Sequence, residues 1–75
     1  MSSRVITRNK HGILTTGEVL ISALPKAARF RGCVTFRPLM SGMPESIECK
    51  ETDATEAEAL QRATLLANRH FPPGG

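Results

Sequence analysis

A chain of 75 residues makes a single domain, near the lower limit at which a hydrophobic core holds without disulfides or a metal. Hydrophobic residues make up 40% of the chain but aromatic residues only 4%, so we expect a thin aliphatic core that a partner subunit would help to complete. The opening residues lack the apolar run of a signal peptide, and no stretch reaches membrane-spanning length. These features exclude a membrane-spanning protein and predict a cytoplasmic one.

The net charge of +3 is unevenly spread along the chain. Residues 1 to 37 carry seven basic side chains and one acidic one, whereas residues 38 to 75 carry three basic and six acidic ones. Such segregation favours a polyanionic partner or head-to-tail self-association. The alternative is the ordinary solvation of a small surface.

Residues 1 to 17 permit two interpretations. RVITR and ILTT flank Asn9 and Gly12 as the arms of a short hairpin would, but a basic terminal segment can equally be a mobile arm. We expect a partly ordered basic arm, with residues 13 to 16 running into the next strand.

Three strands are expected after this arm. EVLISAL (residues 18–24) is apolar and stops at Pro25, which fits the second position of a type I turn. RFRGCVTFR (residues 29–37) ends at Pro38, and SIECKET (residues 46–52) follows a short connection. Short connections favour an antiparallel meander with residues 29–37 in the centre.

The central strand alternates without a break. One face carries Phe30, Gly32, Val34 and Phe36, and the other carries Arg29, Arg31, Cys33, Thr35 and Arg37. Cys49 shares a face with Ile47 on the next strand, so the two cysteines are expected on opposite faces, where they cannot form a disulfide. Two free thiols suit a reducing compartment.

Residues 56 to 70 carry the clearest helix pattern. Thr55 and Glu58 form a capping box at its start, and the proline-rich segment from residue 72 ends it. Glu58 and Arg62 are spaced as an outward i, i+4 ion pair. The stripe expected to face the core consists of Ala59, Leu60, Ala63, Leu66, Ala67 and His70.

Small residues on this helix and Gly32 on the central strand predict a close approach of helix and sheet. The expected fold is therefore α+β, a three-stranded antiparallel β-meander with one C-terminal helix packed on one face. Residues 18–71 would form this domain, and residues 72–75 a disordered tail. An extra N-terminal strand is the alternative.

No arrangement typical of catalysis occurs in the sequence. His11 falls in a predicted turn, and His70 in the last helical turn, where a histidine usually caps and packs. The chain has no phosphate loop, no nucleophile elbow and no metal-ligand spacing. A domain of this size is also expected to lack a ligand pocket of about 300 Å³ or more. We therefore expect neither an enzyme nor a cofactor, a metal or a small-molecule substrate.

Two surfaces are candidates for binding. The first, which we call the arginine face, consists of Arg29, Arg31, Arg37 and Lys50 on the open side of the sheet. A β-ribbon can enter a major groove, and arginine binds phosphates or guanine edges in a bidentate manner, although the absence of an aromatic residue here excludes base stacking. The alternative is a solvated face that keeps a small sheet from aggregating.

The second candidate surface is the loop after the central strand. Leu39, Met40 and Met43 would make an adaptable apolar contact for a protein partner. The alternative, which we favour slightly from the sequence, is that these side chains fold back over the helix end and thicken the core.

Residues 18–24 would form an edge strand that lacks an inward charge, a bulge or a mid-strand proline. We expect such an edge to be covered. Either residues 13–16 and the segment before them form a fourth strand, or a second copy pairs with the edge in a homodimer.

The order of elements from Glu18 to Phe71 resembles that of a group of short bacterial β-β-β-α proteins of unknown function. The motif that carries the resemblance is Thr55-Glu56-Ala57-Glu58-Ala59-Leu60, followed by Ala63, Ala67 and Phe71. The same order is similar to the core of HicB-type antitoxins, which implies toxin neutralisation. The chain differs from those antitoxins in lacking a "PDLPGC" stretch before the helix.

The sequence thus predicts a small non-enzymatic binding module that acts through protein–protein contact or self-association. Nucleic-acid binding by the arginine face and a HicB-like antitoxin core are the alternatives. We expect no membrane partner and no small-molecule partner.

Overall fold

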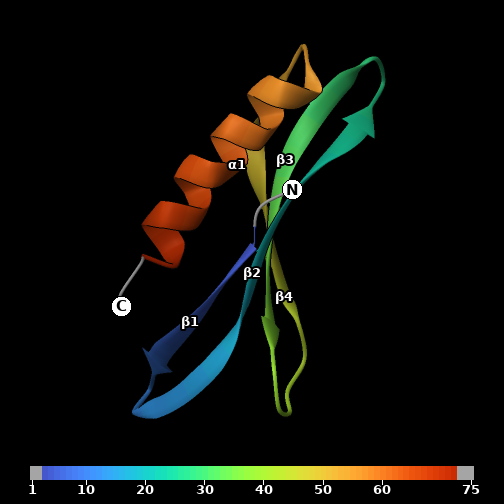
Figure 1. Cartoon of the computed structure of the whole chain (residues 1–75). Coiled ribbons are helices and arrows are strands. Elements are labelled where there is room, and N and C mark those ends of the chain that lie inside the picture. Colours follow the sequence, from blue (N-terminus) through green and yellow to red (C-terminus); the bar gives the residue numbers. More distant parts are fainter. Residues whose placement is uncertain (1–2, 73–75) are drawn as a thin grey trace.

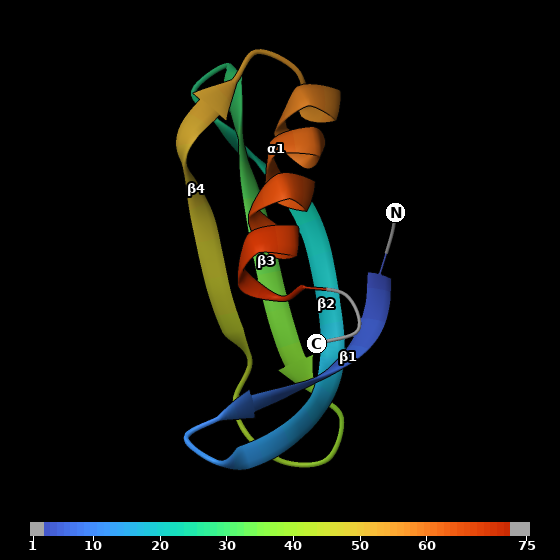
Figure 2. The same cartoon turned by 90° about the vertical axis from the view of Figure 1, so that its left-hand side faces the viewer.

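The structure, a computed structural model, describes residues 3–72. Four antiparallel strands form one sheet in the order β1-β2-β3-β4, and a single helix covers one of its faces (Figure 1, Figure 2). The elements are β1 (Ser3–Lys10), β2 (Ile13–Lys26), β3 (Arg29–Pro38), β4 (Glu45–Asp53) and α1 (Glu56–His70). The predicted α+β class, the antiparallel meander and the C-terminal helix are confirmed, whereas the sheet has one strand more than we expected.

The additional strand is the N-terminal segment, which we expected to be a partly ordered arm. β1 pairs with β2 in an unbroken register from Ser3 opposite Leu20 to Lys10 opposite Ile13. His11 and Gly12 close this hairpin with φ of 56° and 81°, the two-residue turn that matches the twist of antiparallel strands. The expected domain boundary at residues 17 and 18 therefore falls inside β2. The expected tail lies outside the described residues except for Pro72.

The turn between β2 and β3 lies two residues later than expected. Pro25 and Lys26 belong to β2, and Ala27 and Ala28 form the turn with φ of 47° and 70°. The placement of Pro25 in a type I turn was therefore wrong. Lys26 and Arg29 close the two-residue turn, so the nitrogen of Pro25 faces away from β3, where no N–H is needed.

The edge of β2 is covered only in part. β1 pairs with residues 13–20, which confirms a fourth strand; only the segment before residue 13 forms it, whereas residues 13–16 belong to β2. Among the described residues, no strand lies beside residues 21–26 on that side. Pro25 lies in this uncovered stretch and offers no N–H to a neighbouring strand, so the edge does carry a proline that discourages pairing. The homodimer alternative stays a prediction.

The core lies between α1 and the helix-facing side of the sheet. The predicted close approach at Gly32 is confirmed, because a Cβ atom there would lie 2.6 Å from the carbonyl oxygen of Ala59. Phe71 stacks on Phe36 with ring centroids 5.5 Å apart, and so provides aromatic bulk that the alanine-rich helix lacks. The main cluster consists of Ile6, Val19, Val34, Phe36, Cys49, Ala63, Ala67 and Phe71.

The helix begins and ends where the sequence predicts. The N–H of Glu58 donates to the Thr55 hydroxyl at 3.2 Å, which confirms Thr55 as the N-cap. The Glu58 carboxylate accepts from the Thr55 hydroxyl at 3.1 Å, and not from the Thr55 backbone N–H as in a complete capping box. His70 is exposed, so its assignment to the core stripe was wrong. Within residues 3–72, no helix is long and apolar enough to cross a membrane.

Arg62 corrects a further expectation. It donates to both carboxylate oxygens of Asp53, at 2.8 and 2.9 Å, and to Glu51 at 2.8 Å, instead of pairing with Glu58. A bidentate contact with a buried carboxylate is stronger than an exposed i, i+4 pair. The contact joins the end of β4 to the first half of α1.

Candidate binding surfaces

The arginine face lies on the open side of the sheet, as predicted, but its side chains also contact neighbouring strands. Arg37 forms an ion pair with Glu18, which lies directly opposite it on β2. Arg29 donates to the hydroxyl of Thr52 at 2.7 Å and to its carbonyl oxygen at 2.9 Å. Lys50 is exposed and has no carboxylate within 4.0 Å among residues 3–72.

Arg31 supports an irregularity in the sheet. The register of β3 and β4 shifts near Gly32, where Arg31 opposes Thr52 but Cys33 opposes Glu48. The Arg31 guanidinium donates to the carbonyl oxygen of Cys49 and, at 3.0 Å, to that of Lys50. Its Nε also lies 3.9 Å from a carboxylate oxygen of Glu48. Arg31 therefore satisfies carbonyl groups that a bulge takes out of the ladder.

The end of the molecule opposite the β2–β3 turn exposes several large apolar side chains. Met40 and Met43, on the loop between β3 and β4, are 94% and 84% exposed. The N–H of Leu39 donates to the carbonyl oxygen of Thr16 at 3.0 Å, which holds this loop at the same end as the β1–β2 hairpin (Figure 1). We define the end patch as Ile13, Leu14, Leu39, Met40 and Met43, all more than half exposed.

The exposure of the end patch contradicts one of the two interpretations of the loop, and contact with a protein partner stays a prediction. The side chains of Leu39, Met40 and Met43 do not fold back over the helix, so the interpretation that we favoured slightly was wrong. Figure 2 shows why, because α1 ends well short of this end of the sheet. Ile13 and Leu14 were not among our candidates, since we expected the chain to be only partly ordered there.

Two open hollows flank α1. The larger, of about 730 Å³, lies between α1 and β4, and the smaller, of about 390 Å³, lies between β1 and the C-terminal end of α1. Both exceed the volume that we expected for so small a domain. The reason is geometric: α1 rises about 1.5 Å per residue over 15 residues, whereas β2 extends about 3.3 Å per residue over 14. The helix therefore covers only part of the sheet.

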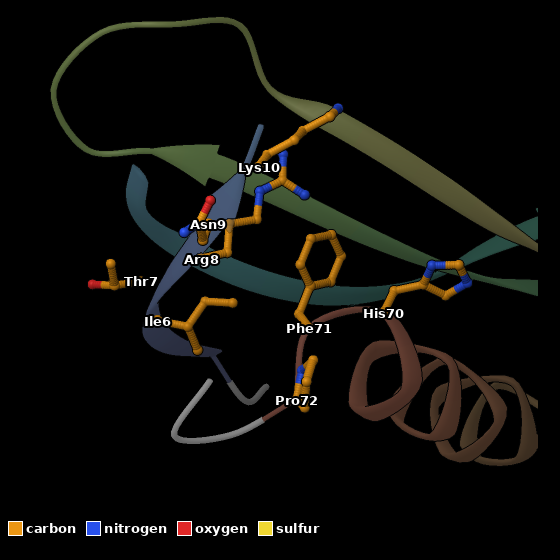
Figure 3. Close-up of a pocket in the computed structure, with 8 residues that line it drawn as sticks. All are labelled: Ile6, Thr7, Arg8, Asn9, Lys10, His70, Phe71 and Pro72. Atoms are coloured by element: carbon orange, nitrogen blue, oxygen red, sulfur yellow. The ribbon is translucent and has the colours of Figure 1, made fainter. Parts of the chain in front are cut away.

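Basic side chains of β1 line the smaller hollow (Figure 3). The Arg8 guanidinium carbon lies 4.3 Å from the ring centroid of Phe36 and 5.2 Å from that of Phe71. Arg8 and Lys10 share the carboxylate of Glu45, with Lys10 at 3.7 Å. The sequence did not indicate these residues, because their roles require β1 to curl across the helix-facing side of the sheet.

Three titratable groups between α1 and the sheet have shifted pKa values. The hydrogen bonds to Asp53 raise the pKa of Arg62 above its ordinary value. Hydrogen bonds from Arg62 hold the pKa of Asp53 below its ordinary value, against the opposing effect of burial. Burial raises the pKa of the Cys49 thiol, which disfavours its reactive thiolate form. Cys33 and Cys49 are both buried and free, in agreement with the prediction that they do not pair. Residues 3–72 contain no group of three or more His, Cys, Asp or Glu placed to hold a metal ion.

Comparison with known proteins adds no identification. No protein-family model, no curated protein and no solved structure matches this chain. The resemblance to short bacterial β-β-β-α proteins and to HicB-type antitoxins therefore stays a prediction.

Proposed function

We propose that this protein is a non-enzymatic module that binds protein surfaces, either another protein or a second copy, through its end patch. The observation that carries the proposal is the gathering of five exposed apolar side chains at one end of the molecule. Singly exposed apolar residues are ordinary, but a cluster of them marks a contact surface. Methionine suits such a surface because its unbranched side chain adapts to a partner's shape.

Hydrogen bonds and a tight turn hold the backbone of the end patch in place. The Leu39–Thr16 hydrogen bond ties the β3–β4 loop to β2, and the two-residue turn at His11 and Gly12 fixes the neighbouring hairpin. A surface of this kind loses less conformational entropy on binding than a free loop does. The groups with shifted pKa values, Asp53, Arg62 and Cys49, take part in ion pairing and packing, which supports a binding role over a catalytic one.

The double variant Met40→Asp/Met43→Asp tests the proposal. It places charge in the end patch without removing a core contact, so the fold should be unchanged. Leu65→Asp is the matched control, because Leu65 is exposed on α1 outside the end patch. Light scattering over a range of concentrations measures self-association, and quantitative affinity capture measures binding to other proteins.

We expect an association that the wild type and Leu65→Asp share and that Met40→Asp/Met43→Asp weakens at least about tenfold. Association that is equal in all three proteins, or absent from all three, would refute the proposal. Light scattering separates the two kinds of partner, since only self-association raises the mass of the purified protein.

Nucleic-acid binding by the arginine face is the second candidate. It is favoured by Arg29 and Lys50, neither of which has a carboxylate within 4.0 Å among the described residues. Arg31 and Arg37 support it less, because Glu48 and Glu18 lie beside them. Salt dependence distinguishes this candidate, because phosphate contacts release counterions whereas apolar contacts do not.

A further inference from the structure

The outer edge of β1 has backbone hydrogen-bonding groups that no other strand of residues 3–72 pairs with. The turn at His11 and Gly12 is closed by the pair of Lys10 and Ile13, and hydrogen-bonded pairs alternate along the ladder from there. The even-numbered residues of β1 therefore direct their peptide groups toward β2. The peptide groups of Val5, Thr7 and Asn9 point away from it. Within residues 3–72, no strand lies on that side of β1.

β1 carries Arg4, Arg8 and Lys10, but it lacks the bulge and the proline that discourage strand pairing at the other edges. Its register with β2 is unbroken and it contains no proline. β4, at the opposite edge, is interrupted by a bulge and carries Glu48 and Lys50, and the uncovered part of β2 contains Pro25. Proteins commonly protect their exposed edges with such features, so the contrast marks β1 as the edge open to a partner strand.

This edge borders a groove (Figure 3). The hollow of about 390 Å³ follows residues 6–10 of β1, and residues 70–72 at the end of α1 form its far wall. Ile6 points toward Phe71, which gives the groove an apolar lining, whereas Thr7 points away. Arg8 and Lys10 bring two positive charges, and the single carboxylate of Glu45 serves both. Among the described residues, Nε of Arg8 has no hydrogen-bond partner.

We propose that this groove binds an extended acidic peptide of a partner protein, which adds to the sheet beside β1 as a further strand. The peptide backbone pairs with Val5, Thr7 and Asn9, as in other cases of strand addition to a sheet edge. Because side chains alternate along a strand, an apolar side chain contacts Ile6 and Phe71 while an acidic one two residues away reaches Arg8 or Lys10. This site adjoins the end patch at the β1–β2 hairpin, where Lys10 pairs with Ile13, but it uses neither Met40 nor Met43 and goes beyond the function proposed for the end patch.

A second copy of the chain fits the edge less well. Two β1 strands paired antiparallel about a two-fold axis would bring their helix-facing side chains opposite one another. The two registers with the greatest overlap place Arg4 of one copy opposite Arg8 or Lys10 of the other. Like charges directly opposite are unfavourable, whereas an acidic strand meets these bases with complementary charge.

The probe is a phage-displayed library of random linear peptides, selected on the full-length folded protein. We expect the selected sequences to alternate acidic and apolar residues. A selected peptide is then synthesised and titrated against variants. Thr7→Pro removes an outward N–H of β1 and spares the ladder with β2, and Ser46→Pro makes the same change on the outer edge of β4. Thr7→Pro should weaken binding at least about tenfold and Ser46→Pro less than about twofold.

Amide hydrogen exchange measures directly whether the peptide pairs with the backbone of β1. Bound peptide should protect the N–H groups of Val5, Thr7 and Asn9, and Lys10→Glu should weaken binding in a salt-dependent manner. Peptide binding should persist in Met40→Asp/Met43→Asp, so failure of this site and failure of the end patch are distinguishable.

Three results would overturn the proposal. The library could yield no acidic and apolar consensus. Thr7→Pro, shown to be folded by protection of its Ile6 and Arg8 amides, could bind the peptide as the wild type does. The outward amides of β1 could become protected at high protein concentration without peptide, which would assign the edge to a second copy.

Discussion

Gly32 sets the distance between α1 and the sheet. A Cβ atom there would lie 2.6 Å from the Ala59 carbonyl oxygen and 3.0 Å from both the Ala63 Cβ and the Cys49 Sγ. These are backbone or short side-chain atoms, so the helix itself would have to move. We expect Gly32→Ala to lower the free energy of unfolding by about 2 kcal/mol, as measured by urea denaturation.

Thr35→Ala is the control for that change, because Thr35 lies on the open face of the same strand. Its effect should stay below about 1 kcal/mol. If the two variants lost equal stability, the close contact between Gly32 and α1 would be refuted.

Asp53 stabilises the fold only while it is ionised. Hydrogen bonds from Arg62 hold its pKa below the ordinary value in the folded chain. The stabilisation is therefore complete above the unfolded-state pKa of about 3.9 and is lost as the pH falls through the lowered folded-state pKa. Asp53→Asn should reduce the thermal midpoint at about pH 7 but have little effect near pH 2, as followed by circular dichroism.

Glu56→Gln, at the exposed start of α1, controls for the loss of a negative charge alone. It should reduce the thermal midpoint less than Asp53→Asn does, because no ion pair to Glu56 is present among residues 3–72. A deficit of Asp53→Asn that remained undiminished at low pH would show that Asp53 acts through something other than its charge.

The sequence predicted burial well where burial depends only on the two-residue alternation of a strand. Val34 and Phe36 are buried while Arg37 is exposed, as strict alternation requires. The partners of Arg31 and Arg62 could not be predicted in this way. The bulge places residues 49–51 of β4 opposite Gly32 alone. The two extra residues leave the alternation of faces intact and give no signal in the sequence.

The hairpin between β2 and β3 turns on two residues with an unfavourable backbone conformation. Ala27 and Ala28 have φ of 47° and 70°, a region that glycine and asparagine adopt at lower cost than alanine. We expect Ala27→Asn/Ala28→Gly to raise the free energy of unfolding by about 1 kcal/mol. The thermal midpoint should then rise by about 4–8 °C, as measured by calorimetry.

Gly12→Ala provides the converse test in the other hairpin, where φ is 81°. It should lower the thermal midpoint, because a side chain is strained there even though no atom lies within 4 Å of the added Cβ. If neither hairpin responded, the turn conformations described here would be wrong.

The limits of an element were predicted better where local capping residues set them than where pairing with a neighbouring strand sets them. The Thr55 cap and the prolines after Phe71 fix the limits of α1 locally. The limits of β2 depend on tertiary structure instead. Pro25 normally ends a strand, but here its nitrogen faces an uncovered edge, and the sequence does not show which edge that will be. The same dependence explains why β1 could be interpreted as an arm.

The chain as a whole brings its basic and acidic halves together. Arg8 meets Glu45, Arg31 lies beside Glu48, and both partners come from the acidic half of the chain. Much of the charge segregation seen in the sequence is therefore neutralised within the fold. This outcome was not predictable from composition, because it depends on how far β1 curls toward β4 (Figure 2).

The remaining positive charge limits how well the arginine face can hold a polyanion. Arg37 and Arg31 have carboxylates beside them, which leaves Arg29 and Lys50 for phosphates. Each phosphate contact contributes about −0.9 to the log–log salt slope, so duplex DNA should bind weakly with a slope no steeper than about −2. Fluorescence anisotropy between about 50 and 200 mM salt measures this slope.

Arg29→Glu/Lys50→Glu should abolish this salt dependence, whereas Met40→Asp/Met43→Asp should leave it unchanged. A slope of about −4 or steeper would require all four cations of the arginine face to bind phosphate. Arg31 and Arg37 would then have to leave Glu48 and Glu18 and exchange one carboxylate each for a phosphate. That result would favour the open face of the sheet over the end patch as the main binding surface that we propose.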